Sequence, residues 1–412
     1  MSQRILILGA GFAGLWSALG AARALDELGV GPERVEVAVV NRTAWHSIRV
    51  RNYEADLEPT RVKLSQVLNP VGVKHIEGEV TGIDVAARTV TYSNNNSSHH
   101  IAYDRLVFAL GSRLVRPEIP GLAQYGFDVD TYEAAARLNA HIAKLPSLPP
   151  LPGKYDVLVV GGGLTGIETA TEMVAKLRRA IAAVSGPQPA PAPRVVLADR
   201  QPWIGSDMGE SARPVIAEAL RALGVETRVG VSVARIDEHG AILTTGERIA
   251  TATVIWCAGM QANPLTACFG VERDRFGRLP VDDCLKIKGL SAEFAAGDVA
   301  WFLIDGARSC VMSCQHGRPM GRFAGHNAAC DLLGKPLLPL RIDWYTTILD
   351  LGRWGAVYTE GWDRRVASTG AAAKRTKEMI NRQRIYPPLS GNRRELLDAA
   401  APVVQTPPLL FH

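Results

Sequence analysis

The stretch DVLVVGGGLTGIE, residues Asp156–Glu168, joins an apolar run to a group of glycines and then to a helical pattern. Gly161, Gly163 and Gly166 have the spacing GxGxxG directly after the predicted strand. The first glycine permits a tight turn, the second lets the backbone approach a pyrophosphate, and the third lets the helix pack closely on the strand. The stretch therefore predicts a strand–turn–helix unit whose helix N-terminus faces the phosphates of a dinucleotide.

A similar stretch, RILILGAGFAGL, opens the chain at Arg4 and carries the same spacing in Gly9, Gly11 and Gly14. One GxGxxG is weak evidence, but two copies, each between a buried strand and a helix, are a strong signal. A chain of 412 residues with 47% hydrophobic residues is long enough for two or three domains. We therefore expect two dinucleotide-binding units.

The residue that is expected to contact the ribose of the dinucleotide differs between the two units. Asp199, at the end of VVLADR, is placed to accept hydrogen bonds from the 2′-hydroxyl of NADH and to repel the 2′-phosphate of NADPH. The first unit offers Asn41 at the end of VAVVNR, and an amide can bind a hydroxyl without charge. The neighbouring Arg42 and Arg200 are either solvated loop charges or contacts to adenine or phosphate.

Composition and charge exclude several classes of protein. The 46 Lys and Arg are scattered among 41 Asp and Glu, with a net charge of +5, so we expect no nucleic-acid partner. The six cysteines lack a CxxC pair, which favours a reducing cytoplasm. No apolar run approaches the roughly 20 residues that span a bilayer. We predict no metal site.

Prolines interrupt the chain at two places. AKLPSLPPLPGK, Ala143–Lys154, separates the two units and predicts a domain boundary. VSGPQPAPAP, residues 184–193, interrupts the second unit, and we expect an extended surface loop there.

Five motifs in order carry a resemblance: the first GxGxxG, YDRLVFALGS, the second GxGxxG ending in Glu168, TVIWCAG and EFAAGDVA. The sequence resembles the flavoproteins with two dinucleotide-binding domains, and most of all the type II NADH:quinone oxidoreductases. The resemblance implies FAD on the first unit and NADH on the second. It implies hydride transfer from NADH to FAD, and then electron transfer to a quinone or another small acceptor.

The implied fold is α/β, with two Rossmann-like domains, the second inserted in the first, and a small C-terminal region. The predicted ranges are 1–145 and 276–335 for the FAD-binding domain, 153–275 for the NADH-binding domain and 336–412 for the C-terminal region.

The resemblance also assigns cofactor contacts. Asp298 would hydrogen-bond the ribityl chain of FAD, and the backbone of Val80 would meet adenine. His316 either contacts the isoalloxazine or is simply buried. The other residues that the resemblance places beside the cofactors are Ala109, Gly111, Gly259 and Gly297.

Three residues are expected at the reacting centre. Glu168 would position the nicotinamide, and Lys374 would approach from the C-terminal region, although a surface lysine is nearly as good an interpretation. Gln315 matches one of the two glutamines of the family's quinone pocket, whereas Pro319 stands where the second would fall. The acceptor therefore stays open between a quinone and another small oxidant.

Other interpretations stay open as well. A ferredoxin-type reductase and a flavin-binding sensor with little turnover are the alternative functions. Cys310 and Cys314 form a CxxxC that is either redox-active or part of the core, and His46 is either a covalent flavin link or a pocket residue.

The proline-broken C-terminal tail lacks an amphipathic helix, so we expect a cytoplasmic protein with at most weak contact to the inner face of the membrane. A homodimer is possible.

Overall fold

The computed structural model describes residues 2–183 and 192–411. Most of the proline-rich stretch VSGPQPAPAP, for which we predicted a surface loop, lies outside the described residues.

The first domain is built on a five-stranded parallel sheet with the order β21-β9-β1-β2-β5. The strands of this sheet are β1 (Gln3–Leu8), β2 (Val35–Asn41), β5 (Lys74–Glu77), β9 (Arg105–Phe108) and β21 (Glu293–Ala295). The middle strands read as continuous apolar runs because both faces of a parallel sheet are covered. β21 follows the strands of the second domain in the sequence but pairs with β9 of the first domain. This order confirms that the second domain is inserted in the first.

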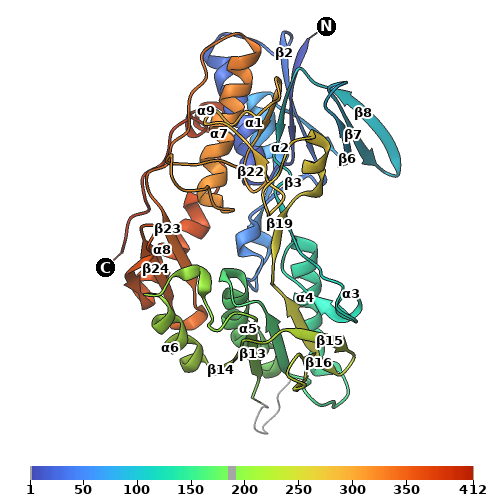
Figure 1. The fold of residues 1–412 in the computed structure, drawn as a ribbon, viewed down its shortest axis with the longest axis vertical. Helices are drawn as coiled ribbons and strands as arrows, with labels where there is room; N and C mark the ends of the chain where they lie inside the picture. Colours follow the sequence, from blue (N-terminus) through green and yellow to red (C-terminus); the bar gives the residue numbers. More distant parts are fainter. Residues whose placement is uncertain (1, 184–191, 412) are drawn as a thin grey trace.

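Two helices lie side by side on this sheet, α1 (Phe12–Glu27) and α7 (Cys314–Leu332) (Figure 1). Glycines allow the close approach: a Cβ atom on Gly321 would overlap the carbonyl oxygen of Ala13, and one on Gly325 would overlap that of Ser17. The beginning of α7 is thereby held next to the beginning of α1.

The second domain repeats the plan with a parallel sheet of order β11-β18-β12-β13-β14. Its strands are β11 (Gly126–Phe127), β12 (Asp156–Val160), β13 (Arg194–Asp199), β14 (Val225–Val229) and β18 (Thr253–Trp256). The helices that accompany it are α4 (Tyr132–Lys144), α5 (Leu164–Ala182) and α6 (Arg213–Leu223). The predicted α/β class with two Rossmann-like domains is therefore confirmed.

The chain passes between the domains through two paired strands, β10 (Ser112–Leu114) and β19 (Met260–Ala262). Because β11 and α4 lie downstream of β10 and join the second sheet, the pairing favours a start of the NADH-binding domain upstream of residue 153. The exact domain ranges stay a prediction.

Smaller elements complete the fold. Three antiparallel sheets are formed by β6 (Glu79–Asp84), β7 (Thr89–Asn94) and β8 (Ser97–Ala102), by β15 (Val233–Asp237), β16 (Gly240–Leu243) and β17 (Arg248–Ala250), and by β23 (Thr346–Asp350), β24 (Ala356–Glu360) and β25 (Arg365–Thr369). The C-terminal region continues with α8 (Gly370–Met379), the π-helical turn η8 (Ile380–Arg384) and α9 (Arg393–Ala399). Its sheet packs on α5, and α9 packs on α1, so this region contacts both domains.

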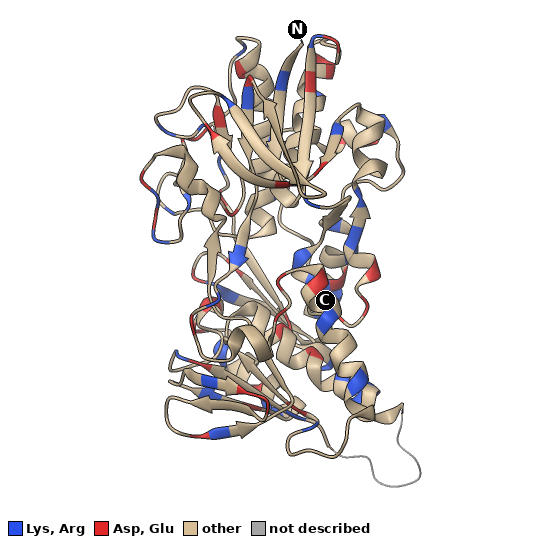
Figure 2. Ribbon diagram, turned by 90° about the vertical axis from the view of Figure 1, so that its right-hand side faces the viewer, with Lys and Arg blue, Asp and Glu red and all other residues tan. Residues whose placement is uncertain are grey.

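Charges of both signs are interspersed in the view of Figure 2, in agreement with their scatter along the sequence.

Candidate active site

The first glycine turn has the geometry that its spacing predicts. Gly9 has a positive φ of +92°, and a Cβ atom on Gly14 would overlap the carbonyl oxygen of Gly9. Gly11 differs, because a Cβ atom there would meet nothing within 4 Å. It is also the N-cap of α1 and provides no side-chain cap. The turn therefore leaves open space in front of helix N–H groups that have no helical partner.

The second turn repeats this arrangement. Gly161 has a φ of +114°, and a Cβ atom on Gly166 would overlap the Gly161 carbonyl oxygen. Gly163 is the N-cap of α5, and a Cβ atom there would lie 3.1 Å from Asp207 Oδ2. The second turn therefore has the same tight glycine geometry as the first, but the Asp207 carboxylate lies close to its N-cap, where the first turn is open.

Asn41 and Asp199 occupy equivalent places at the ends of β2 and β13, and each binds the glycine turn of its own domain. The Ala10 N–H donates to Asn41 Oδ1 at 2.9 Å, and the Gly162 N–H donates to Asp199 Oδ2. Asn41 Nδ2 also donates to the Thr43 carbonyl at 2.7 Å. Both side chains therefore shape the turns, and their contact with a ribose stays a prediction.

Asp298 lies where the first domain meets the link between the domains. It follows Gly297, whose φ is +78°, and accepts a hydrogen bond from Ser112 Oγ at 2.6 Å. Arg49 Nη1 in turn donates to Ser112 Oγ at 2.9 Å. Gly111, next to Ser112, has a φ of +68° and open space where a Cβ atom would stand. Asp298 and Gly111 are thus neighbours, as the resemblance implies.

The other expected cofactor residues are spread around the two turns. Val80 lies buried in β6, and Ala109 is buried beyond the end of β9. The Gly259 carbonyl oxygen accepts a hydrogen bond from the Val115 N–H at 3.1 Å. Arg42 and Arg200 are exposed. The structure leaves their roles as predictions.

His316 is fully buried in the first turn of α7. Its Nδ1 accepts the Val311 N–H at 2.8 Å, so the neutral ring carries its proton on Nε2. This Nε2 is buried and has no hydrogen-bond partner within residues 2–183 and 192–411. Burial lowers the pKa of His316 to about 4, so the ring is neutral at pH 7 and presents an unsatisfied donor.

His46 is also fully buried, on β3 (Trp45–Ser47). Its Nδ1 hydrogen-bonds the Ala10 carbonyl at 2.8 Å, and burial lowers its pKa to about 4. His46 Nε2 has no partner in the described part of the chain, and as the bare nitrogen of this tautomer it is an acceptor. His46 thus lies beside the first glycine turn, and a covalent link to flavin stays a prediction.

Glu168 belongs to a buried cluster of charges between the second domain and the C-terminal region. Lys377 Nζ donates to Glu168 Oε1 at 2.7 Å, and the Asp350 backbone N–H donates to the same oxygen at 3.1 Å. Lys374 Nζ pairs with the Asp350 carboxylate at 2.6 and 2.7 Å. Tyr53 from the first domain donates to Asp350 at 3.1 Å. Three parts of the chain meet in this cluster.

The ionisation of the cluster is governed by burial and by the ion pair. Burial raises the pKa of Glu168, against the opposing effect of Lys377. Burial by itself would lower the pKa of Lys377. The nearby carboxylates of Glu168 and Asp350 have the larger effect and raise the Lys377 pKa. Each charge of the pair therefore depends on the other.

Sequence reasoning found only part of this cluster. It selected Lys374, whereas the lysine that binds Glu168 is Lys377, one helical turn further along α8. The i,i+3 spacing of the two lysines is a signal that could have found the second. Asp350 and Tyr53 gave no such signal, because only the fold brings them together.

Gln315 is held at the beginning of α7 by the start of the C-terminal sheet. Its amide is 3.5 Å from the Trp344 carbonyl and from Thr346 Oγ1. Pro319 lies buried inside α7 and offers no polar group to a ligand.

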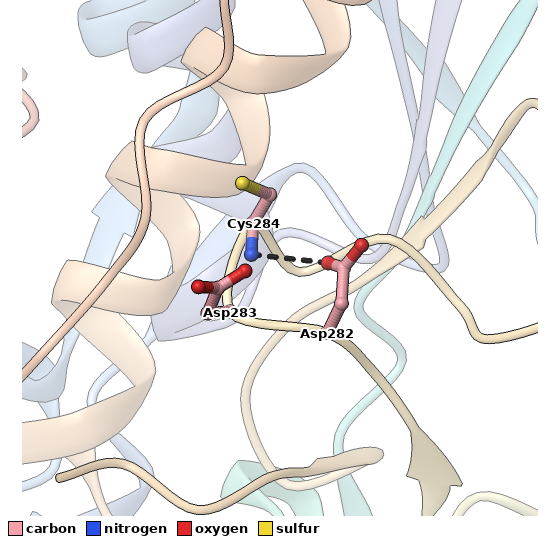
Figure 3. Close-up of side chains that lie close together, drawn as sticks. All are labelled: Asp282, Asp283 and Cys284. Carbon is pink, nitrogen blue, oxygen red and sulfur yellow. Dashed lines mark hydrogen bonds between the residues drawn. The ribbon is translucent and has the colours of Figure 1, made fainter. Parts of the chain in front are cut away.

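Two groups of residues contain cysteines that could be considered for redox or metal chemistry. Cys310 and Cys314 are free thiols, and burial raises the pKa of both, which disfavours the reactive thiolate. Asp282, Asp283 and Cys284 lie together in a turn (Figure 3), where Asp282 Oδ1 accepts the Cys284 N–H at 3.0 Å. This hydrogen bond explains Asp282 as a residue that stabilises the turn.

Comparison with known proteins supports a single family. The family model described as pyridine nucleotide-disulphide oxidoreductase matches residues 3–321. The chain belongs to this family. It is an FAD-dependent NAD(P)H oxidoreductase, as the two glycine turns indicate.

The chain is similar to several named relatives. It is 56% identical to an NADH dehydrogenase-like protein of Mycobacterium tuberculosis, over 98% of this chain and 100% of the relative. It is 28% identical to a type II NADH:quinone oxidoreductase of the same organism, over 76% of this chain and 72% of the relative. The fold matches NDH2 from Plasmodium falciparum in complex with NADH, with a TM-score of 0.78, 13% identity and 97% coverage of both chains.

Within the described residues, every helix is too short or too polar to cross a membrane.

Proposed function

We propose that the protein transfers hydride from NADH to FAD and then passes the electrons to a quinone. The observation that carries this proposal is the pair of matching glycine turns, one in each domain, together with the buried Glu168 and Lys377 beyond the second turn. The similarity to NADH dehydrogenase-like and NADH:quinone oxidoreductase proteins supports the same reaction.

The first domain fits FAD. Gly11 leaves room for a pyrophosphate, and the buried Nε2–H of His316 is a donor that a polar cofactor atom can satisfy. When bound, FAD supplies an acceptor for two electrons as hydride and a donor to the next acceptor. The protein's own residues bind and orient the reactants.

The second domain fits NADH. The Gly163 turn would hold its pyrophosphate, and the negative charge of Asp199 would disfavour a 2′-phosphate. Glu168 would position the nicotinamide, with Lys377 holding the Glu168 carboxylate in place. Lys374 and Gln315 would lie on the acceptor side, toward the C-terminal region.

The test of this function is anaerobic mixing of the yellow holoenzyme with NADH, followed by a panel of acceptors. We expect NADH to bleach the flavin absorbance faster than NADPH, and short-chain quinones to restore it. Reoxidation by a ferredoxin but not by quinones would contradict the proposal. Slow reoxidation by every acceptor would instead identify a flavin-binding sensor.

The role of Glu168 has its own test. Glu168→Gln should retain FAD but slow its reduction by NADH or weaken NADH binding, by about 1–3 kcal/mol, as for a charged hydrogen bond. Glu218→Gln, at an exposed position of α6, is the control and should leave reduction unchanged. Unchanged rapid-mixing kinetics in Glu168→Gln would remove Glu168 from the reacting centre.

Membrane contact and assembly belong to the same proposal. We propose at most weak peripheral contact with the inner face of the membrane. A homodimer stays a prediction.

A further inference from the structure

Two arginines on α7 are buried to an unusual degree for charged side chains. The side chains of Arg318 and Arg322 belong to residues that are only 6% and 2% exposed. Both guanidinium groups lie over the indole ring of Trp16, with Cζ at 5.2 Å and 4.3 Å from the ring centroid. The i,i+4 spacing places them one helical turn apart, so two like charges share one aromatic ring.

No carboxylate compensates these charges among residues 2–183 and 192–411. Within the described residues, Arg322 Nη1 donates to the Val403 carbonyl at 3.5 Å. Arg384, which acts electrostatically on both arginines, is also positive. Burial lowers the pKa of Arg318 to about 10 and that of Arg322 to about 9. Buried charges without a partner are costly, which points to a partner that comes from outside the chain.

The unsatisfied atoms define the chemistry of that partner. Among the residues that the structure describes, no hydrogen-bond partner reaches the buried Arg318 Nε, Arg322 Nε or Trp16 Nε1. Each of these atoms is a donor and none is an acceptor. A group that only accepts hydrogen bonds and carries negative charge complements these donors, and guanidinium groups bind carboxylate and phosphate especially well.

We propose that Arg318, Arg322 and Trp16 form a buried binding site for an oxyanion, such as a carboxylate, phosphate or sulfonate. The anion is either free in solution or carried by the electron acceptor. The second source is compatible with the place of the site, because Arg318 acts electrostatically on His46, which binds the Ala10 carbonyl in the first glycine turn. The site goes beyond the proposed function, since a free anion needs no turnover.

The site is distinct from the glycine turn that would hold the cofactor phosphates. Trp16 lies more than a turn beyond the N-terminus of α1, whereas the open N–H groups are at Gly11. The residues that close the site come from the C-terminal segment, at Val403 and at Arg384, which donates to the Thr406 carbonyl.

The free anion is tested by titrating the flavin-loaded protein with inorganic phosphate, with calorimetry and thermal unfolding as the measurements. We expect binding that Arg318→Gln/Arg322→Gln weakens at least tenfold. Arg382→Gln is the matched control, because Arg382 is an exposed arginine of the neighbouring turn η8 and pairs with Glu378. Without phosphate, the double variant should be at least as stable as the wild type, because it no longer buries two uncompensated charges.

The acceptor-borne anion is tested with 1,4-naphthoquinone-2-sulfonate and uncharged 1,4-naphthoquinone. If the acceptor carries the anion, the ratio of kcat/KM for the sulfonated over the uncharged quinone should fall at least tenfold in the double variant and stay constant in Arg382→Gln. A response in either arm supports the site and identifies the source of the anion.

Three results would overturn the proposal: no response in either arm, an equal response in Arg382→Gln, or loss of FAD from the double variant, which would assign the arginines to the cofactor. If the double variant does not fold, Arg322→Gln and the charge-retaining Arg322→Lys replace it, with weakened phosphate binding expected in the first alone. A protein that binds phosphate but reduces no quinone would contradict the proposed function and leave this site intact.

Discussion

At the scale of single residues, the structure changes the meaning of Glu168. A glutamate early in a helix is ordinarily solvated, but here the side chain is 8% exposed and bound to an equally buried Lys377. An ion pair of this kind contributes little net stability compared with apolar residues, yet the loss of one partner is costly. The pair therefore fixes the orientation of the Glu168 carboxylate.

We expect Lys377→Met to lower the free energy of unfolding by about 3 kcal/mol, because Glu168 would be left buried and uncompensated. The double variant Glu168→Gln/Lys377→Met should recover most of this loss. Urea unfolding of the holoenzyme and both variants measures the difference. A single variant as stable as the wild type would show that the pair is open to water.

The two buried histidines predict a sensitivity to acid. Burial lowers the pKa of His46 and His316 to about 4, whereas the unfolded chain protonates its histidines near 6.5. The unfolded state therefore binds more protons between these values, and stability is lost as the pH falls from about 6.5 toward 4, by up to about 3 kcal/mol for each histidine.

His316→Gln should flatten this dependence when the free energy of unfolding is measured between pH 7 and pH 4.5. His239→Gln is the control, since His239 is exposed and its loss should leave the slope unchanged. An unaltered slope in His316→Gln would mean that the ring is already protonated in the folded protein.

At the scale of elements, the glycines of the two strand–turn–helix units have different structural roles. Gly9 and Gly161 require positive φ, and Gly14 and Gly166 let the helix touch the turn. Of Gly9, Gly11 and Gly14, only Gly11 has neither a positive φ nor a close contact that excludes a Cβ atom. Its lack of a side chain therefore leaves space for the ligand. Structural and ligand-binding glycines can therefore be separated by mutation.

Gly11→Ala should fold with unchanged thermal stability but bind FAD at least tenfold more weakly, because the added methyl group occupies the space in front of the helix N-terminus. Gly14→Ala should instead destabilise the first domain, since its Cβ atom would overlap the Gly9 carbonyl. Flavin content and thermal unfolding distinguish the two. Full flavin content in Gly11→Ala would place the pyrophosphate elsewhere.

At the scale of the whole molecule, the C-terminal region joins the two domains. Asp350, on its first strand, accepts hydrogen bonds from Tyr53 of the first domain and from Lys374 of α8. Its backbone N–H donates to Glu168 of the second domain. The relative placement of the two glycine turns thus depends on a residue that belongs to neither.

Asp350→Asn should lower the free energy of unfolding by about 1–2 kcal/mol, because the half-buried Lys374 loses its carboxylate partner. We also expect flavin fluorescence and far-ultraviolet circular dichroism to report separate urea transitions, as the domains become less coupled. Coincident transitions in the variant would show that other contacts suffice to join the domains.

The sequence by itself determined the two dinucleotide-binding units, because glycine spacing and buried strands are local properties that each unit carries in about a dozen residues. It also pointed to Glu168 and to the region of Lys374. The tertiary structure alone decided that Lys377 binds Glu168 and that Asp350 and Tyr53 join them. It alone also decided that Arg318 and Arg322 are buried with no counter-charge from the described residues. These contacts join residues more than a hundred positions apart, and a helical charge pattern does not reveal which side of the helix another segment will cover.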